Sequence, residues 1–134
     1  MQIDDNLIDE QDDDVWAAMH LNGFVHEAHQ ASLTAGWWDG ISKDDKIIIA
    51  AKLALVHSEI SEALEGHRKD LMDDKLPHRK AIEVELADAA IRIFDLAGWL
   101  DLDLGGALVE KMAFNAQRED HKRENRAAAH GKKY

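Results

Sequence analysis

The sequence predicts an all-α fold, arranged as an antiparallel four-helix bundle that assembles as a homo-oligomer. The chain of 134 residues has a single proline, Pro77, and no run of alternating apolar and polar residues of the kind that forms strands. Its apolar residues fall into four segments of about 20 residues joined by short polar connections, which is the pattern of a helical bundle.

A first helix is expected over residues 14–32. The aspartates at positions 12–14 offer N-cap oxygens and place negative charge at the positive end of the helix dipole. The glycines of the segment 36–40 then bracket a loop that holds Trp37 and Trp38. Because glycine tolerates sharp turns, this loop can present an indole ring outward.

The remaining helices follow from similar signals. A second helix is expected over residues 43–69, with Ser42 as its N-cap, and a polar connection ends it. A third helix is expected over residues 79–100. Asp103 is expected to cap a fourth helix that continues to about residue 123.

The third helix is apolar around most of its circumference, and a helix of this kind is buried on several sides. A lone bundle of this size rarely buries one helix so fully. We therefore expect a second copy to cover part of it, as a homodimer or a tetramer. The apolar positions are Val84, Leu86, Ala87, Ala90, Ile91, Ile93, Phe94 and Ala97.

Charge and composition exclude several classes of function. The net charge is −11, which opposes binding to duplex nucleic acid. The chain has no cysteine, so disulfides and thiolate metal sites are excluded. The longest apolar run covers only residues 47–51, and the N-terminus is acidic, so we expect neither a membrane span nor a signal peptide. The predicted protein is cytoplasmic, with an acidic tail over 1–11, a helical domain over 12–126 and a basic tail over 127–134.

Four carboxylates stand beside apolar stripes. Glu59 and Glu62 lie one turn apart on the second predicted helix, and Glu85 and Asp88 lie one turn apart on the third. Two like charges at about 4 Å repel by about 4 kcal/mol at an effective dielectric of about 20. Two divalent cations would balance four carboxylates, and ligand sets made only of oxygen select Mg²⁺ or Mn²⁺.

Other interpretations of these acids are weighed against the metal site. A ferritin-like di-iron centre needs Glu-x-x-His on two helices, and neither acid pair contains a histidine. A single Glu-x-x-Glu on a helix is usually a solvated face. The pattern alone leaves a second interpretation beside the metal site, in which the protein is a non-catalytic acidic bundle that binds a partner protein.

The two acid pairs also resemble a family signature. Glu59-x-x-Glu62 followed by Glu85-x-x-Asp88 is similar to the motif of the MazG-like, all-α nucleoside triphosphate pyrophosphohydrolases. The usual motif begins with two consecutive glutamates, and Ser58 stands in place of the first, which leaves a fifth carboxylate and a third metal ion open. Further segments resemble small stand-alone members of this family, namely 57–65, 85–93, 110–118, 130–134, and His26 with 36–39.

The resemblance implies a reaction, the hydrolysis of a (deoxy)nucleoside triphosphate to the monophosphate and pyrophosphate by water attack on the α-phosphorus. It implies two or more Mg²⁺ or Mn²⁺ ions held by Glu62, Glu85 and Asp88, with Glu59 as a further ligand or as the catalytic base. The tryptophan pair favours a purine such as dGTP. The related phosphoribosyl-ATP pyrophosphohydrolases cannot be separated by the acids alone.

Other residues are candidates for contacts with the nucleotide. Lys111, Asn115 and Arg118 fall at i, i+4 and i+7 on the fourth predicted helix, where they would hold phosphates or the base, or would form a solvated polar face. Arg92 and Asp95 are expected to form a structural ion pair on the third helix.

Lys52 lies seven residues before Glu59 on the same predicted helical face, so we expect it to pair with that carboxylate or to contact a phosphate. Trp37 and Trp38 have two alternatives. An indole could stack on the nucleobase, or it could plug the end of the bundle. One tryptophan could take each role.

Overall fold

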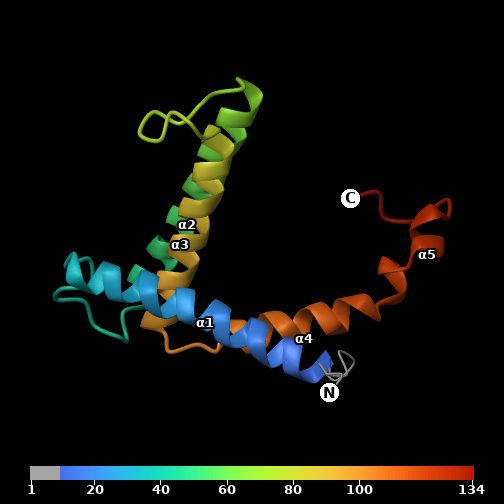
Figure 1. Cartoon of the computed structure of the whole chain (residues 1–134), viewed down its shortest axis with the longest axis horizontal. Helices are drawn as coiled ribbons and strands as arrows, with labels where there is room; N and C mark the ends of the chain where they lie inside the picture. The colour runs from blue at the N-terminus through green and yellow to red at the C-terminus, as the bar shows by residue number, and fades with distance from the viewer. Residues whose placement is uncertain (1–9) are drawn as a thin grey trace, which may run out of the picture. The chain divides into compact units, whose positions relative to one another are not determined.

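The computed structural model describes residues 10–134, and the regular structure of this part of the chain is helical (Figure 1). The all-α prediction is confirmed for these residues, in which one isolated antiparallel bridge, between Met72 and Lys80, is the sole β-type pairing. The predicted acidic tail lies outside the described residues over positions 1–9. The elements are α1 (Glu10–Thr34), α2 (Lys46–Arg68), α3 (Ala81–Trp99), α4 (Leu104–Ala116), a 3-10 turn η1 (Glu119–His121) and α5 (Arg123–Ala127).

The first two helix starts differ from the sequence prediction. Helix α1 already begins at Glu10, so the aspartates at 12–14 lie inside its first turns and do not cap it. Helix α2 is capped by Asp45, whose side chain accepts hydrogen bonds from the backbone N–H groups of Ile47 and Ile48 at 3.0 and 3.2 Å. Ser42 instead accepts the N–H of Asp44, and the expected Ser42 cap is therefore wrong.

The fourth helix starts as predicted but ends early. The Asp103 side chain caps α4 by accepting the backbone N–H of Gly106 at 2.9 Å. The helix stops at Ala116 rather than near residue 123, because Arg118 adopts an extended conformation and binds Asp120 through two hydrogen bonds of 2.9 and 2.7 Å. Arg118 is thus beyond the helix, and the predicted stripe from Lys111 to Arg118 is not one helical face.

The chain divides into two units, one made of residues 1–22 and 103–134 and the other of residues 23–102. In the first unit, α1 and α4 approach closely at Gly105, where a Cβ atom would overlap the backbone of Ala18. Asn22 fastens this contact, because its side chain accepts the N–H of Gly105 and donates to Asp103, both at 2.8 Å.

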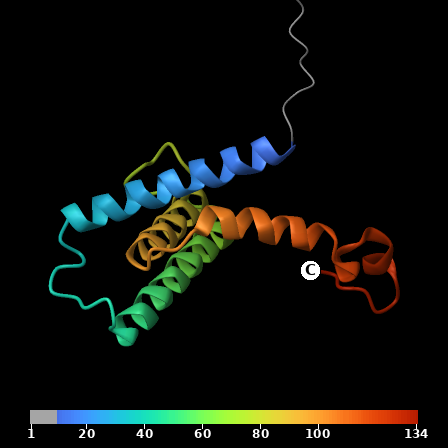
Figure 2. The same cartoon turned by 90° about the horizontal axis from the view of Figure 1, so that it is seen from below.

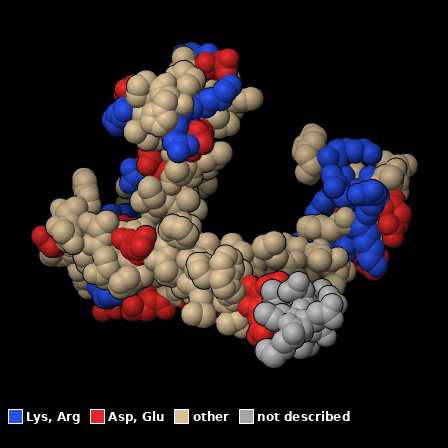
Figure 3. All heavy atoms as spheres, viewed as in Figure 1, with Lys and Arg blue, Asp and Glu red and all other residues tan. Residues whose placement is uncertain are grey.

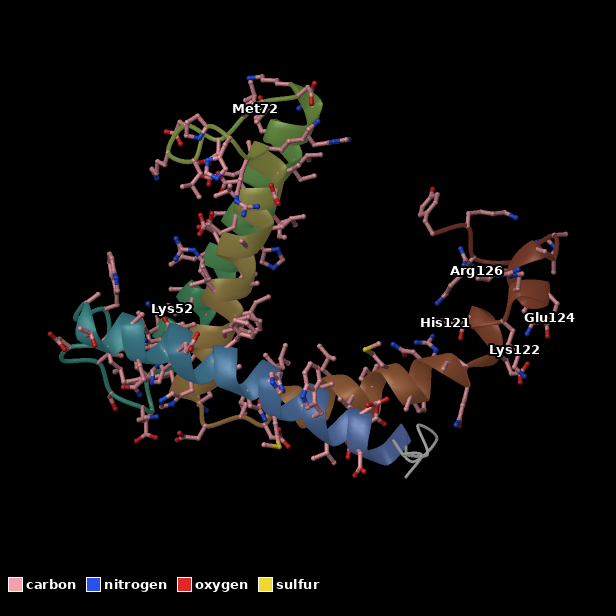
Figure 4. The ribbon with its side chains drawn as sticks, in the orientation of Figure 1. Lys52, Met72, His121, Lys122, Glu124 and Arg126 are labelled. Atoms are coloured by element: carbon pink, nitrogen blue, oxygen red, sulfur yellow. The ribbon has the colours of Figure 1, made fainter. Side chains whose placement is uncertain are left out.

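The C-terminal segment of the first unit is rich in basic side chains, which gather over the region of α5 in Figure 3. Figure 4 labels His121, Lys122 and Arg126 on this segment. The predicted basic tail folds back on it, since the ammonium group of Lys132 lies 2.9 Å from the carboxylate of Asp120.

The second unit is built on an antiparallel pair, in which α2 and α3 run side by side in both views (Figures 1 and 2). Small residues permit the approach. A Cβ atom on the buried Gly66 would come within 2.8 Å of the Cβ of Ala81, and Ala63 and Ala89 are also buried. The loop between the helices is held by the buried Asp73, whose carboxylate accepts two backbone N–H groups.

The core of the second unit lies where the loop after α1 meets α3. Trp38 and Trp99 are buried and stacked, with ring centroids 4.1 Å apart and planes 9° apart, and Leu96 packs with them. The ammonium group of Lys52 lies 4.3 Å from the ring centre of Trp38, and that of Lys43 lies 4.6 Å from Trp99. Cations over both outer faces complete a four-layer stack.

Several apolar side chains of α3 are exposed in the single chain, and the sequence analysis predicts that a second copy covers part of this helix. Leu86, Ile91 and Ile93 are 40–51% exposed, whereas Ala89 and Leu96 on the side facing the unit are buried. None of the helices in the described part of the chain is both long and apolar enough to cross a membrane.

Candidate metal centre

Three carboxylates converge between the paired helices. Glu59 of α2 and Glu85 and Asp88 of α3 each offer an oxygen atom, and these atoms lie within 4.8 Å of one another. Glu59 is 7% exposed, Glu85 is half-buried and Asp88 is exposed. Glu62, the fourth predicted acid, is exposed one turn further along α2 and acts electrostatically on Glu85. The structure therefore brings three of the four predicted acids together, and Glu62 lies close enough to influence Glu85.

The helix contacts explain why these acids meet. Ala63 lies one turn after Glu59, and Ala89 directly follows Asp88. Both alanines are buried in the second unit, where α2 packs against α3. Because small side chains let two helices approach closely, the acids that border them are directed at the same space.

The crowding of these acids changes their protonation. The pKa of Glu85 is raised from 4.5 to about 7. Burial of the carboxyl group is the largest cause, followed by the negative charge of Glu62 and by a hydrogen bond with Glu59. At neutral pH a proton on Glu85 therefore relieves part of the repulsion.

A guanidinium group also offsets negative charge in the cluster. Nε of Arg92 donates to Oε1 of Glu59 at 2.5 Å, so that this buried carboxylate has a charged partner. The sequence predicted that Arg92 pairs with Asp95 and offered Lys52 as a partner of Glu59. Both pairings are wrong, because the crossing of α2 and α3 places Glu59 opposite Arg92, while the ammonium of Lys52 lies over the ring of Trp38.

Asp95 has partners on α1 and on the loop after it, which the sequence analysis did not predict. One of its oxygens lies 2.8 Å from both His29 Nδ1 and Trp38 Nε1, and the other accepts the Ser32 hydroxyl at 2.8 Å. The one sign of this site in the sequence is that His29 and Ser32 lie one turn apart on α1 and so share a helical face. Only the packing of α1 on α3 shows that both side chains face the same carboxylate.

A cavity of about 600 Å³ opens beside the acid cluster. This volume lies within the usual range for sites that bind small molecules. Figure 4 shows Lys52, which lines it from α2. Its walls combine charged groups with apolar surface, and all come from the second unit: Ala28, Ala31, Ser32, Trp37, Lys52, Leu55, Glu59, Asp88, Ile91, Arg92 and Asp95.

The two tryptophans of the loop after α1 take different positions. Trp38 is 3% exposed, with one ring face on Trp99 and the other under Lys52, so it packs as a plug. Trp37 is 69% exposed and lines the cavity, where its ring is open to a ligand. The exposure of Trp37 leaves the stacking alternative open for this residue.

The three polar candidates of the fourth predicted helix lie in the other unit. The ammonium group of Lys111 is 4.7 Å from the ring centre of Phe114, and Arg118 is paired with Asp120. The side-chain oxygen of Asn115 is buried and has no hydrogen-bond partner in the part of the chain that the structure describes. The acid cluster belongs to the second unit.

The donor set fits a hard divalent cation. All three converging ligands are carboxylates, which suit Mg²⁺ or Mn²⁺. At Mg²⁺–oxygen distances of 2.0–2.1 Å, adjacent ligand oxygens are about 2.9 Å apart and opposite ones about 4.2 Å, so a bound cation would draw the three carboxylates closer together. The cluster contains no histidine, unlike the di-iron sites of helical bundles.

No protein-family model, curated protein or solved structure significantly matches the chain. The likeness to the MazG-like enzymes therefore rests on the acid motifs and the segments around them.

Proposed function

We propose that the protein is a Mg²⁺- or Mn²⁺-dependent pyrophosphohydrolase that converts a (deoxy)nucleoside triphosphate to the monophosphate and pyrophosphate. The observation that carries the proposal is the convergence of Glu59, Glu85 and Asp88 within 4.8 Å at the edge of a cavity of about 600 Å³. A solvated acidic face would give neither the convergence nor the burial of Glu59.

A bound divalent cation would supply positive charge against the triphosphate and would acidify the attacking water. Glu62, Glu85 and Asp88 hold the cation in this proposal. Glu59 is a further ligand or takes the proton from the water as the α-phosphorus is attacked. Its burial beside α3 fixes its position, which favours either role.

The walls of the cavity suit the rest of the nucleotide. Lys52 brings positive charge to the side of the cavity formed by α2, where phosphates would lie. Trp37 offers an accessible ring for the base, and its size favours a purine such as dGTP. The proposal also includes contacts of the substrate with Lys111, Asn115 and Arg118.

The proposal includes a cytoplasmic homo-oligomer whose helices complete a four-helix bundle. Its basis is the exposed apolar surface of α3, which includes Leu86 and Ile93. Sedimentation should give at least twice the 15.1 kDa of one chain, as a dimer or a tetramer. A monomer at micromolar concentration would contradict this part.

The activity is tested by screening all NTPs and dNTPs, together with phosphoribosyl-ATP, for pyrophosphate release in the presence of Mg²⁺ or Mn²⁺. Asp88→Asn should abolish turnover while leaving the helical circular dichroism unchanged. Glu83→Gln is the matched control, because Glu83 lies on the same helix but is exposed and pairs with Arg79. Equal pyrophosphate release by the Asp88 variant and the control would refute the metal-centre assignment.

A further inference from the structure

Arg92 connects the acid cluster to the cavity. Its Nε atom is 2.5 Å from Oε1 of Glu59, one of the three converging acids. Its side chain is 40% exposed and lines the cavity, whereas the side chain of Glu59 is 9% exposed. The guanidinium group therefore neutralises a buried carboxylate on one side and reaches the cavity on the other.

Two other carboxylates of α3, Asp88 and Asp95, line the same cavity as Arg92, and Asp88 is one of the acids that the cation would hold. Asp95, one turn further along α3, already interacts with His29, Ser32 and Trp38. Within the described residues, Glu59 is the ion-pair partner that the structure shows for Arg92. A guanidinium released from Glu59 would thus meet the cavity and any phosphate in it.

We propose that Arg92 exchanges partners when the cluster binds a divalent cation. Without the cation Arg92 holds Glu59, and with the cation it is released to bind the phosphates of a ligand in the cavity. This inference rests on the proposed function and deepens it, because it names a residue that couples cation binding to phosphate binding.

The physical basis is competition for one carboxylate. A guanidinium and a divalent cation are both positive, so each weakens the binding of the other at Glu59. Phosphate oxygens match the planar fork of arginine, and such charge-assisted hydrogen bonds are among the strongest in proteins. Since coupling between two binding events is reciprocal, the cation should strengthen phosphate binding and phosphate should strengthen cation binding.

The first test is calorimetry on Arg92→Gln with Mn²⁺ alone. We expect the variant to bind Mn²⁺ several-fold more tightly than the wild type, because the competitor is gone. With Mn²⁺ saturating, we expect it to bind inorganic pyrophosphate about tenfold or more weakly. Arg79→Gln is the matched control, because it removes the same charge just before the start of α3. Arg79 pairs there with the exposed Glu83.

A second variant makes the test independent of how well Arg92→Gln folds. Glu59→Gln removes the carboxylate that holds Arg92, so pyrophosphate binding without any divalent cation should become tighter than in the wild type. Glu62→Gln removes an equal charge from an exposed neighbour that Arg92 does not contact. The gain in pyrophosphate affinity of Glu59→Gln should exceed that of Glu62→Gln several-fold.

Two results overturn the inference. If Arg92→Gln matches Arg79→Gln in its affinities for both Mn²⁺ and pyrophosphate, Arg92 is a structural ion pair only, and the proposed activity is unaffected. If neither the wild type nor any variant binds Mn²⁺, the partner exchange and the proposed function fail together. A gain in Mn²⁺ affinity with a loss in pyrophosphate affinity, seen in Arg92→Gln alone, supports the exchange.

Discussion

Trp38 and Trp99 stack with their ring planes 9° apart, and this contact fastens the loop after α1 to the end of α3. The pair buries large apolar surface, so its loss should lower stability rather than substrate affinity. The neighbouring Trp37 is exposed and has no such role.

This difference gives a prediction for the two tryptophans. Trp38→Ala should cost about 3–5 kcal/mol of unfolding free energy, as is usual for truncating a buried aromatic side chain. Trp37→Ala should leave the melting temperature nearly unchanged and should raise KM about tenfold or more, because stacking on a base contributes about 1–3 kcal/mol. Melting curves and KM for both variants check this. A normal KM in Trp37→Ala would place the base elsewhere.

Asp95 should matter for stability through its three partners. In Asp95→Asn the amide cannot accept as strongly from His29, Ser32 and Trp38, and we expect a loss of about 1–3 kcal/mol. Urea denaturation measures the loss. Asp74→Asn, in the exposed loop between α2 and α3, is the control and should change stability by less than about 0.5 kcal/mol. Equal stability of the two variants would contradict the assigned role.

The raised pKa of Glu85, about 7, predicts how stability depends on pH in the absence of divalent cations. Glu85 binds its proton more tightly in the folded state, so its contribution is fully present below pH 4.5 and is lost as pH rises through 7. At neutral pH and above, Glu85→Gln should therefore be more stable than the wild type, by at most about 3 kcal/mol, because one pKa unit is about 1.4 kcal/mol. Melting curves between pH 4 and 9 in EDTA test this. The stability of the wild type should fall relative to that of Glu85→Gln as the pH rises over this range. A constant difference between the two would contradict the prediction.

The same proton should oppose cation binding. Because a ligating carboxylate must be ionised, Mn²⁺ affinity should rise by up to about tenfold per pH unit below pH 7 and should level off above it. Calorimetry at pH 5.5, 6.5 and 8 measures the trend. In Glu85→Gln, the part of the pH dependence of Mn²⁺ affinity that is due to this proton should disappear. An unchanged slope would assign the pH dependence to another group.

Gly98 should be needed for the approach of α1 to α3. A Cβ atom at this position would lie 2.5 Å from the Cβ of His29, so Gly98→Ala should cost about 1–3 kcal/mol. Gly23→Ala is the control, because nothing lies within 4 Å of a Cβ there and alanine favours a helix by about 1 kcal/mol. Opposite shifts of the two urea midpoints are expected. Shifts of the same sign would contradict the close packing at Gly98.

Local signals were enough for much of the fold. The helical class follows from the spacing of apolar residues and from the scarcity of proline, and the Asp103 cap follows from its position before an apolar run. The end of α4 was missed, because the pairing of Arg118 with Asp120 two residues later competes with the helix, and this conformation leaves no signal in apolar periodicity.

The sequence by itself determined which residues share a helical face, because the rise and turn of a helix depend on the backbone alone. Glu85, Asp88, Arg92 and Asp95 lie on one stripe of α3 for this reason. Only the tertiary structure decided the partner of each. The packing of α2 brings Glu59 to Arg92, and the packing of α1 and its loop brings His29 and Trp38 to Asp95. Such choices depend on where helices cross, which is set by the small residues at their contacts and not by the spacing of charges.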